Sequence, residues 1–134
     1  MAATATQQII NDGHRNLNLK YTIAGTSGDT AAGTLLTASG FDDALGTALG
    51  ANGLTLMGVE ASLTGFSCNL LWDATTDVNL FEIPSDEYVK VDFSSFGGIK
   101  DNSSTGSTGN VNFTTTGYTA SGDGGHIYLK FKKT

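Results

Sequence analysis

Hydrophobic and polar residues alternate with a period of two along much of the chain. In residues 16–23 (NLNLKYTI) every second residue is Leu, Tyr or Ile, and the residues between them are Asn, Lys or Thr. Residues 88–93 (YVKVDF), 111–116 (VNFTTT) and 126–132 (HIYLKFK) repeat the pattern. Such alternation predicts strands of an antiparallel sheet with one buried and one solvated face. The side chains expected inside are Leu17, Leu19, Tyr21, Ile23, Val89, Val91, Phe93, Val111, Phe113, Ile127, Leu129 and Phe131.

The alternation changes phase inside one longer run, residues 53–65 (GLTLMGVEASLTG). Leu54 and Leu56 follow one phase, and from Met57 onward the apolar residues follow the opposite one. A β-bulge produces such a switch, because one extra residue in a strand turns the following side chains to the other face. Gly58 lies close to the switch, so we predict a bulge there.

Glycine and proline usage indicates how the strands are joined. Eighteen glycines and one proline favour many tight turns, because glycine adopts the positive φ angles that turns require. Residues 1–134 suffice for one domain, which we predict to be all-β: an antiparallel β-sandwich or jelly roll of about eight strands, with residues 1–12 as an extended N-terminal arm. Only residues 41–50 (FDDALGTALG) favour a helical turn, with Asp42 as its N-cap. The polar residues 97–110 predict a long surface loop.

The charge of the chain argues against some classes of partner. The net charge is −6, which disfavours direct binding of nucleic acid or of a membrane surface. The apolar runs are too short to span a bilayer, and no signal-peptide pattern is visible, so we expect synthesis in the cytoplasm. Lys130, Lys132 and Lys133 form a local basic cluster, interpreted as a solvated strand face. Cys68, the single cysteine, lies in an apolar run and is expected in the core.

The segment LWDATTDV (residues 71–78) holds Asp73 and Asp77 beside Trp72, the only tryptophan. Two apolar runs flank it, which predicts the turn of a hairpin, with Asp73 accepting hydrogen bonds from downstream backbone N–H groups and Asp77 closing the loop. A Ca²⁺ site is the alternative, but it needs about six to eight oxygen ligands, and a catalytic carboxylate pair is a third interpretation. The spacing also differs from that of a self-sufficient calcium loop. We therefore favour the turn and predict no metal site.

Other catalytic motifs are absent from the sequence. The two histidines, His14 and His126, have no zinc-ligand spacing. Residues 25–34 (GTSGDTAAGT) are rich in glycine but lack the G-K-[ST] of a phosphate-binding loop, and no G-x-S-x-G elbow occurs. Asp123 is interpreted as part of a hairpin turn. These observations predict a protein without catalytic residues or a cofactor.

Four segments in the second half of the chain occur in a distinctive order before the closing alternating strand. They are WDATTD (72–77), DFSSFGG (92–98), NSSTGSTG (102–109) and FTTTGY (113–118). In this order they resemble a group of small virion proteins of tailed bacteriophages. Other members have His where this chain has Tyr118, which argues against a metal ligand at that position.

The resemblance implies a structural component of the phage particle, such as a head decoration (cement) protein without enzyme activity. Such a protein is made in the host cytoplasm and lies on the capsid surface of the virion. The implied partners are the major capsid protein or other virion proteins, together with further copies of the chain in a homo-oligomer, for which a trimer is one form.

The N-terminal residues are the expected partner interface. They are extended in character, mix polar and apolar residues and lie at a terminus, so we expect residues 2–10 to order on assembly and pair with another chain by strand addition. The alternative function is a tail- or fibre-associated binding module, for instance one that binds carbohydrate. An exposed Trp72 would favour that alternative, whereas a buried Trp72 would favour the decoration protein. The predicted interface residues are Ala2, Thr4, Thr6, Ile9 and Ile10.

Overall fold

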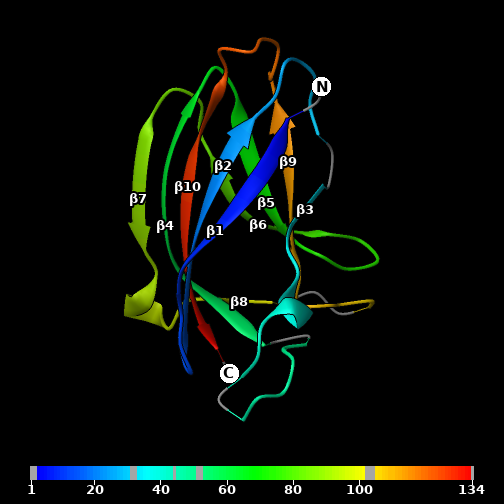
Figure 1. The fold of residues 1–134 in the computed structure, drawn as a ribbon, viewed down its shortest axis with the longest axis vertical. Helices are drawn as coiled ribbons and strands as arrows, with labels where there is room; N and C mark the ends of the chain where they lie inside the picture. The colour runs from blue at the N-terminus through cyan, green and yellow to red at the C-terminus, as the bar shows by residue number, and fades with distance from the viewer. Residues whose placement is uncertain (1–2, 31–32, 44, 51–52, 102–104, 134) are drawn as a thin grey trace.

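The described part of the chain folds into ten β-strands with two short 3-10 helices (Figure 1). The structure is a computed structural model that describes residues 3–30, 33–43, 45–50, 53–101 and 105–133. No α-helix occurs in these ranges. The strands are β1 (Thr4–Asp12), β2 (Asn16–Ala24), β3 (Gly33–Leu36), β4 (Leu54–Thr64), β5 (Ser67–Trp72), β6 (Val78–Ile83), β7 (Tyr88–Asp92), β8 (Ile99–Lys100), β9 (Val111–Thr116) and β10 (Gly124–Lys133), and the 3-10 helices are η1 (Ala38–Gly40) and η2 (Ser94–Phe96).

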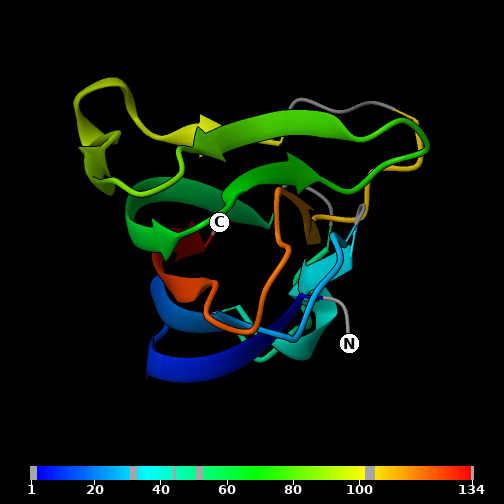
Figure 2. The same ribbon diagram turned by 90° about the horizontal axis from the view of Figure 1, so that it is seen from above.

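The strands form two antiparallel sheets. One sheet has the order β1-β2-β10-β4-β7, and β8 pairs with the first residues of β4 as its sixth strand. The second sheet has the order β3-β9-β5-β6. Figure 2 shows the two layers from above, with β5 and β6 in one layer and β1 and β2 in the other. The prediction of an all-β protein with two antiparallel sheets, consistent with a β-sandwich, is confirmed.

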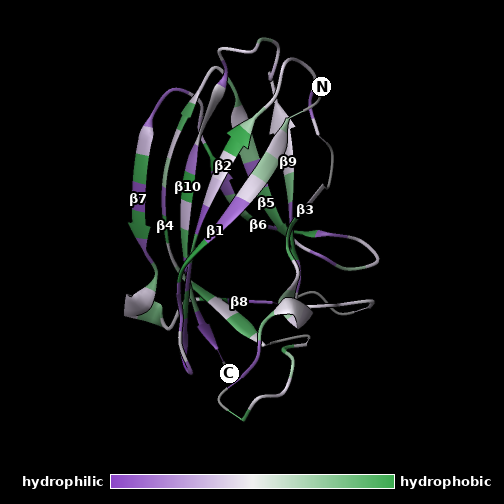
Figure 3. Ribbon diagram, viewed as in Figure 1, coloured by the Kyte–Doolittle hydropathy of each residue, from purple (hydrophilic) through white to green (hydrophobic). Residues whose placement is uncertain are grey.

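The buried side chains form one hydrophobic cluster to which both sheets contribute. The hydropathy colouring changes along the strands as the alternation requires (Figure 3). Of the twelve side chains expected inside, ten are buried, and Val89 and Val91 on the edge strand β7 are half-buried. An edge strand has a neighbour on one side only, which leaves its apolar side chains partly open to solvent.

The predicted bulge lies in β4. Lys130 of β10 pairs with Gly58, and the next residue, Phe131, pairs with Leu56. Met57 is therefore the extra residue, and it lets both halves of β4 direct their apolar side chains into the core. Leu54, Leu56 and Val59 are all buried as a result.

The helical turn predicted in residues 41–50 is wrong for the residues described there. Asp42 and Ala48 instead form an isolated antiparallel bridge. The carboxylate of Asp43, not that of Asp42, accepts hydrogen bonds from the backbone N–H groups of Leu45 (2.8 Å) and Thr47 (3.0 Å). An aspartate that bonds to the backbone just downstream stabilises a turn in competition with a helix, and this competition decides the local structure.

The hairpin predicted around Asp123 is also wrong, although the turn exists. The Asp123 carboxylate accepts hydrogen bonds from the N–H groups of Thr119 and Ala120. However, β9 and β10 belong to different sheets, so this turn connects the two layers. The buried Tyr118 fills the connection: its hydroxyl donates to the Asp123 backbone oxygen (2.7 Å), and its ring packs edge-on against Phe66.

Candidate functional site

Strand β1 contains the residues of the predicted interface that the structure describes. It pairs with β2 along one side and is the edge of the six-stranded sheet on the other. The segment expected as an extended arm is thus an extended edge strand of its own chain. That it orders on assembly and pairs with another chain stays a prediction.

The start of β1 is held by the loop that follows β2. Ala3 is buried, its N–H donates to the Gly28 oxygen (3.1 Å), and its own oxygen accepts from the Thr30 hydroxyl. Thr4 also donates from its hydroxyl to the Ala24 oxygen. These bonds fix the first residues of the strand, while every residue from Thr6 to Asp12 is exposed.

Two isoleucines are the exposed apolar residues of this edge. The exposed fractions of Ile9 and Ile10 are 51% and 55%. The register with β2 shifts between Ile9 and Asn11, so Ile10 occupies an irregularity in the edge. The structure therefore brings Thr4, Thr6, Ile9 and Ile10 together on one exposed strand, and Ala2 lies outside the described residues.

The hairpin predicted from LWDATTDV is confirmed, because β5 and β6 pair antiparallel on either side of residues 73–77. Asp77 closes the loop as predicted, whereas the role of Asp73 differs from the prediction. Asp77 reaches back and accepts from the Ala74 N–H (3.1 Å). Asp73 instead accepts from side chains that precede and begin β9, the Thr108 hydroxyl (2.7 Å) and the Asn112 amide (3.0 Å).

Asn112 joins the two carboxylates. Its side-chain N–H₂ group donates to Asp73 Oδ1 and to Asp77 Oδ2 (3.1 Å), and the residue is buried. Sequence reasoning missed Asn112 because it lies 35 residues or more from its partners and no local pattern marks it. In the parts of the chain that the structure describes, no three His, Cys, Asp or Glu side chains gather as metal ligands would. The observed contacts are those of a cross-linked turn.

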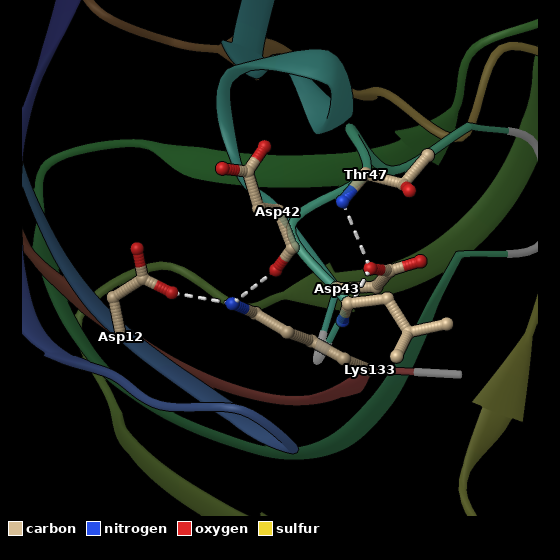
Figure 4. Close-up of polar contacts among 6 residues, drawn as sticks. Asp12, Asp42, Asp43, Thr47 and Lys133 are labelled. Carbon is tan, nitrogen blue, oxygen red and sulfur yellow. Dashed lines mark hydrogen bonds and ion pairs between the residues drawn. The ribbon is translucent and has the colours of Figure 1, made fainter.

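The prediction that Lys133 is solvated, like Lys130 and Lys132, is wrong. Its side chain is 3% exposed, and its ammonium group pairs with the Asp12 carboxylate and donates to the Asp42 backbone oxygen (2.7 Å; Figure 4). Lys130 and Lys132 are exposed as expected. Lys133 points inward because it continues the alternation of Ile127, Leu129 and Phe131 at the rim of the core, where polar partners are within reach.

Asp29 lies in the loop between β2 and β3, which connects the two sheets. Its carboxylate accepts from the Tyr118 N–H (2.8 Å), the Gly117 N–H and the Thr115 hydroxyl. These bonds stabilise the carboxylate and so lower the pKa of Asp29 below its ordinary value of 3.8. The bond from the Tyr118 N–H contributes most. The role of Asp29 is to hold a loop, and sequence reasoning did not single it out.

The remaining sequence candidates do not assemble into a reactive site. Trp72 is buried, so its ring is not a platform for a sugar. Cys68 is also buried, and desolvation raises the pKa of its thiol to about 12, which keeps it protonated and unreactive. His14 follows β1 and His126 pairs with Thr22 near the far end of β2, so the two histidines are apart.

Comparison with models of protein families gives no match to this chain, and comparison with curated proteins gives none either. Across the described ranges there is also no helix with the length and apolar character needed to cross a membrane. The class of protein is thus given by the fold: an all-β protein of two antiparallel sheets.

Proposed function

We propose that this chain is a non-enzymatic virion structural protein that decorates and stabilises a phage capsid by binding the lattice of the major capsid protein. The proposal includes assembly as a homo-oligomer, for which a trimer is one form. It combines the sequence resemblance with one structural observation, the long unprotected edge of β1.

Edge strands normally carry features that prevent pairing with other chains, such as Lys, Pro or short length. Strand β1 has nine residues and contains no Lys, Arg or Pro. The other edges are shorter, since β3 has four residues, β6 has six, and β7 has five and carries Lys90. The one charged residue of β1, Asp12, is its last residue and pairs with Lys133. An added strand would pair with the free backbone groups of β1, and Ile9 and Ile10 would supply apolar contacts.

The buried Trp72 supports the same proposal over its alternative. A tail- or fibre-associated carbohydrate-binding module was expected to expose this ring. Burial removes Trp72 from any binding surface, so that alternative would need another residue.

The test is binding to purified capsids that lack this protein, measured by co-sedimentation. Deletion of residues 2–10, and separately the double substitution Ile9→Lys and Ile10→Lys, should abolish binding, because the first removes the edge and the second places two charges on it. Leu45→Lys is the matched control: Leu45 is also an exposed apolar residue, but it lies outside β1, so binding should persist.

Circular dichroism and urea denaturation must show that each variant is folded. The deletion could abolish binding simply by destabilising the domain. The lysine variant avoids this, because at least half of Ile9 and of Ile10 is already exposed and their replacement should leave the domain folded. Saturation of capsids by a folded lysine variant with unchanged affinity would overturn the proposal.

A further inference from the structure

The outer face of the six-stranded sheet contains a groove of about 570 Å³. Its lining runs from Ile10 on β1 across β2, β10 and β4 to Lys90 on β7. Pockets that hold small ligands typically have volumes of about 300–1,000 Å³, so the groove has the size of a ligand site. The groove shares only Ile10 with the interface predicted on β1.

Strand register determines which side chains meet in this groove. In one row across the sheet, Tyr128 of β10 pairs with Glu60 of β4, and Glu60 pairs with Lys90 of β7. In the next row, Lys130 pairs with Gly58, and Gly58 pairs with Asp92.

Gly58 opens the floor between these two rows. A Cβ atom at this position would lie 3.2 Å from the backbone oxygen of Val91 and 3.7 Å from the Lys130 side chain. Any longer side chain would extend from the floor into the space between the rows. Because glycine has no side chain, the sheet backbone itself forms the bottom of the groove.

The charges in the groove balance. Lys90 and Lys130 supply two cations, and Glu60 and Asp92 supply two carboxylates. An anionic polymer would meet the carboxylates, and a cationic one would meet the lysines, so neither has a clear electrostatic advantage. The four groups together offer both hydrogen-bond donors and acceptors, which a hydroxyl group can use equally well.

One aromatic side chain lies among these polar groups. Tyr128 is 37% exposed, and the Lys20 ammonium lies 5.9 Å from the centre of its ring. Ile10 and Met57 add apolar surface to the lining. An exposed aromatic ring beside balanced donors and acceptors suits a ligand with both an apolar face and many hydroxyl groups.

From these observations we infer that the groove binds a neutral, polyhydroxylated ligand, namely a segment of an oligosaccharide. Tyr128 stacks against the apolar face of one sugar ring. Glu60 and Asp92 accept hydrogen bonds from its hydroxyl groups, and Lys90 and Lys130 donate to its oxygens. This inference goes beyond the proposed function, since decoration of a capsid requires no sugar.

The test uses the full-length, ¹⁵N-labelled protein and a panel of neutral pentasaccharides built from glucose, mannose, xylose or N-acetylglucosamine. At least one should shift the amide resonances of groove residues at millimolar concentration. Tyr128→Ala should weaken that binding by about tenfold, the effect of losing one aromatic contact. Gly58→Gln should abolish it by filling the groove.

Phe96→Ala is the matched control, because Phe96 is a more exposed aromatic residue that does not line the groove. Its affinity should equal that of the wild type. If no member of the panel shifts groove resonances, or if Tyr128→Ala binds as tightly as the wild type, the inference is overturned. Capsid co-sedimentation of Tyr128→Ala distinguishes this result from failure of the proposed function, since that binding should be unchanged.

Discussion

The ammonium group of Lys133 pairs with the carboxylate of Asp12, a residue 121 positions earlier in the chain. The same ammonium donates to the backbone oxygen of Asp42, so one side chain joins β10, the end of β1 and the turn after η1 (Figure 4). Lys133 is almost fully buried, whereas Asp12 is 39% exposed. A buried cation with two oxygen partners stabilises the fold only while both partners remain.

Lys133→Met should lower the free energy of unfolding by about 2 kcal/mol, because the Asp42 oxygen loses its donor and Asp12 its cation. Urea denaturation monitored by tryptophan fluorescence measures the change. Lys132→Met alters the exposed neighbour and should stay within about 0.5 kcal/mol of the wild type. Equal effects of the two substitutions would show that Lys133 is solvated in solution.

Asn112→Ala should destabilise the protein by about 1–3 kcal/mol, because it removes the amide donor shared by Asp73 and Asp77 and leaves two carboxylates facing a buried site.

Thermal unfolding with calcium chloride or with a chelator tests the metal interpretation on the wild type. We expect the same melting temperature in both, since a cation at free concentration c that bound the folded state would stabilise it by RT ln(1 + c/Kd) and so raise the melting temperature with concentration.

Cys68 should resist modification in the folded protein, because its thiol is buried and its pKa is raised to about 12. A chromogenic disulfide reagent should therefore label it slowly at neutral pH and quickly in concentrated urea. Rapid stoichiometric labelling without denaturant would show that β5 opens readily or that the thiol is exposed.

Acid should weaken the fold partly through Asp29. Its pKa is lowered in the folded state, first by the Tyr118 N–H, so its contribution to stability is complete above the ordinary pKa of 3.8 and is lost as the pH falls through the folded-state value. Asp29→Asn removes this titration. The urea midpoint of the variant should lie below that of the wild type near neutral pH and approach it in acid. Parallel midpoint curves for the two proteins would contradict the assignment.

Gly65→Ala should destabilise by about 2 kcal/mol or more, because Gly65 has a φ of +84° and an added Cβ would overlap the Asp123 carboxylate. That carboxylate holds the turn at Thr119 and Ala120, so it cannot move without losing both bonds. Gly122→Ala provides the comparison, since it has open space around it and should change stability little. Differential scanning calorimetry of both variants gives the two values.

Alternation predicted the buried face of most strands, because it reports directly which side of a strand meets apolar neighbours. The shift of phase at Met57 even located the bulge. Alternation carries no record of which strands become neighbours, so it could not reveal that β9 and β10 lie in different sheets. Asn112 was missed for the same reason, since its partners are distant in sequence. Lys133 was predicted to be solvated because of its charge, although the alternation continued beyond Phe131 places it inward. In residues 41–50 the sequence favoured a helix, and two backbone hydrogen bonds to the Asp43 carboxylate stabilise a turn instead.

Strand β10 lies between β2 and β4 in the six-stranded sheet, although it follows every other strand in the sequence. During translation β2 and β4 therefore have no common neighbour, and each leaves a hydrogen-bonding side vacant until β10 has emerged from the ribosome. Pairing of such distant segments is slow to nucleate and leaves strand edges open to other nascent chains. Completion of this sheet thus waits for residues 124–133, and the facing edges of β2 and β4 stay unpaired until that segment is available.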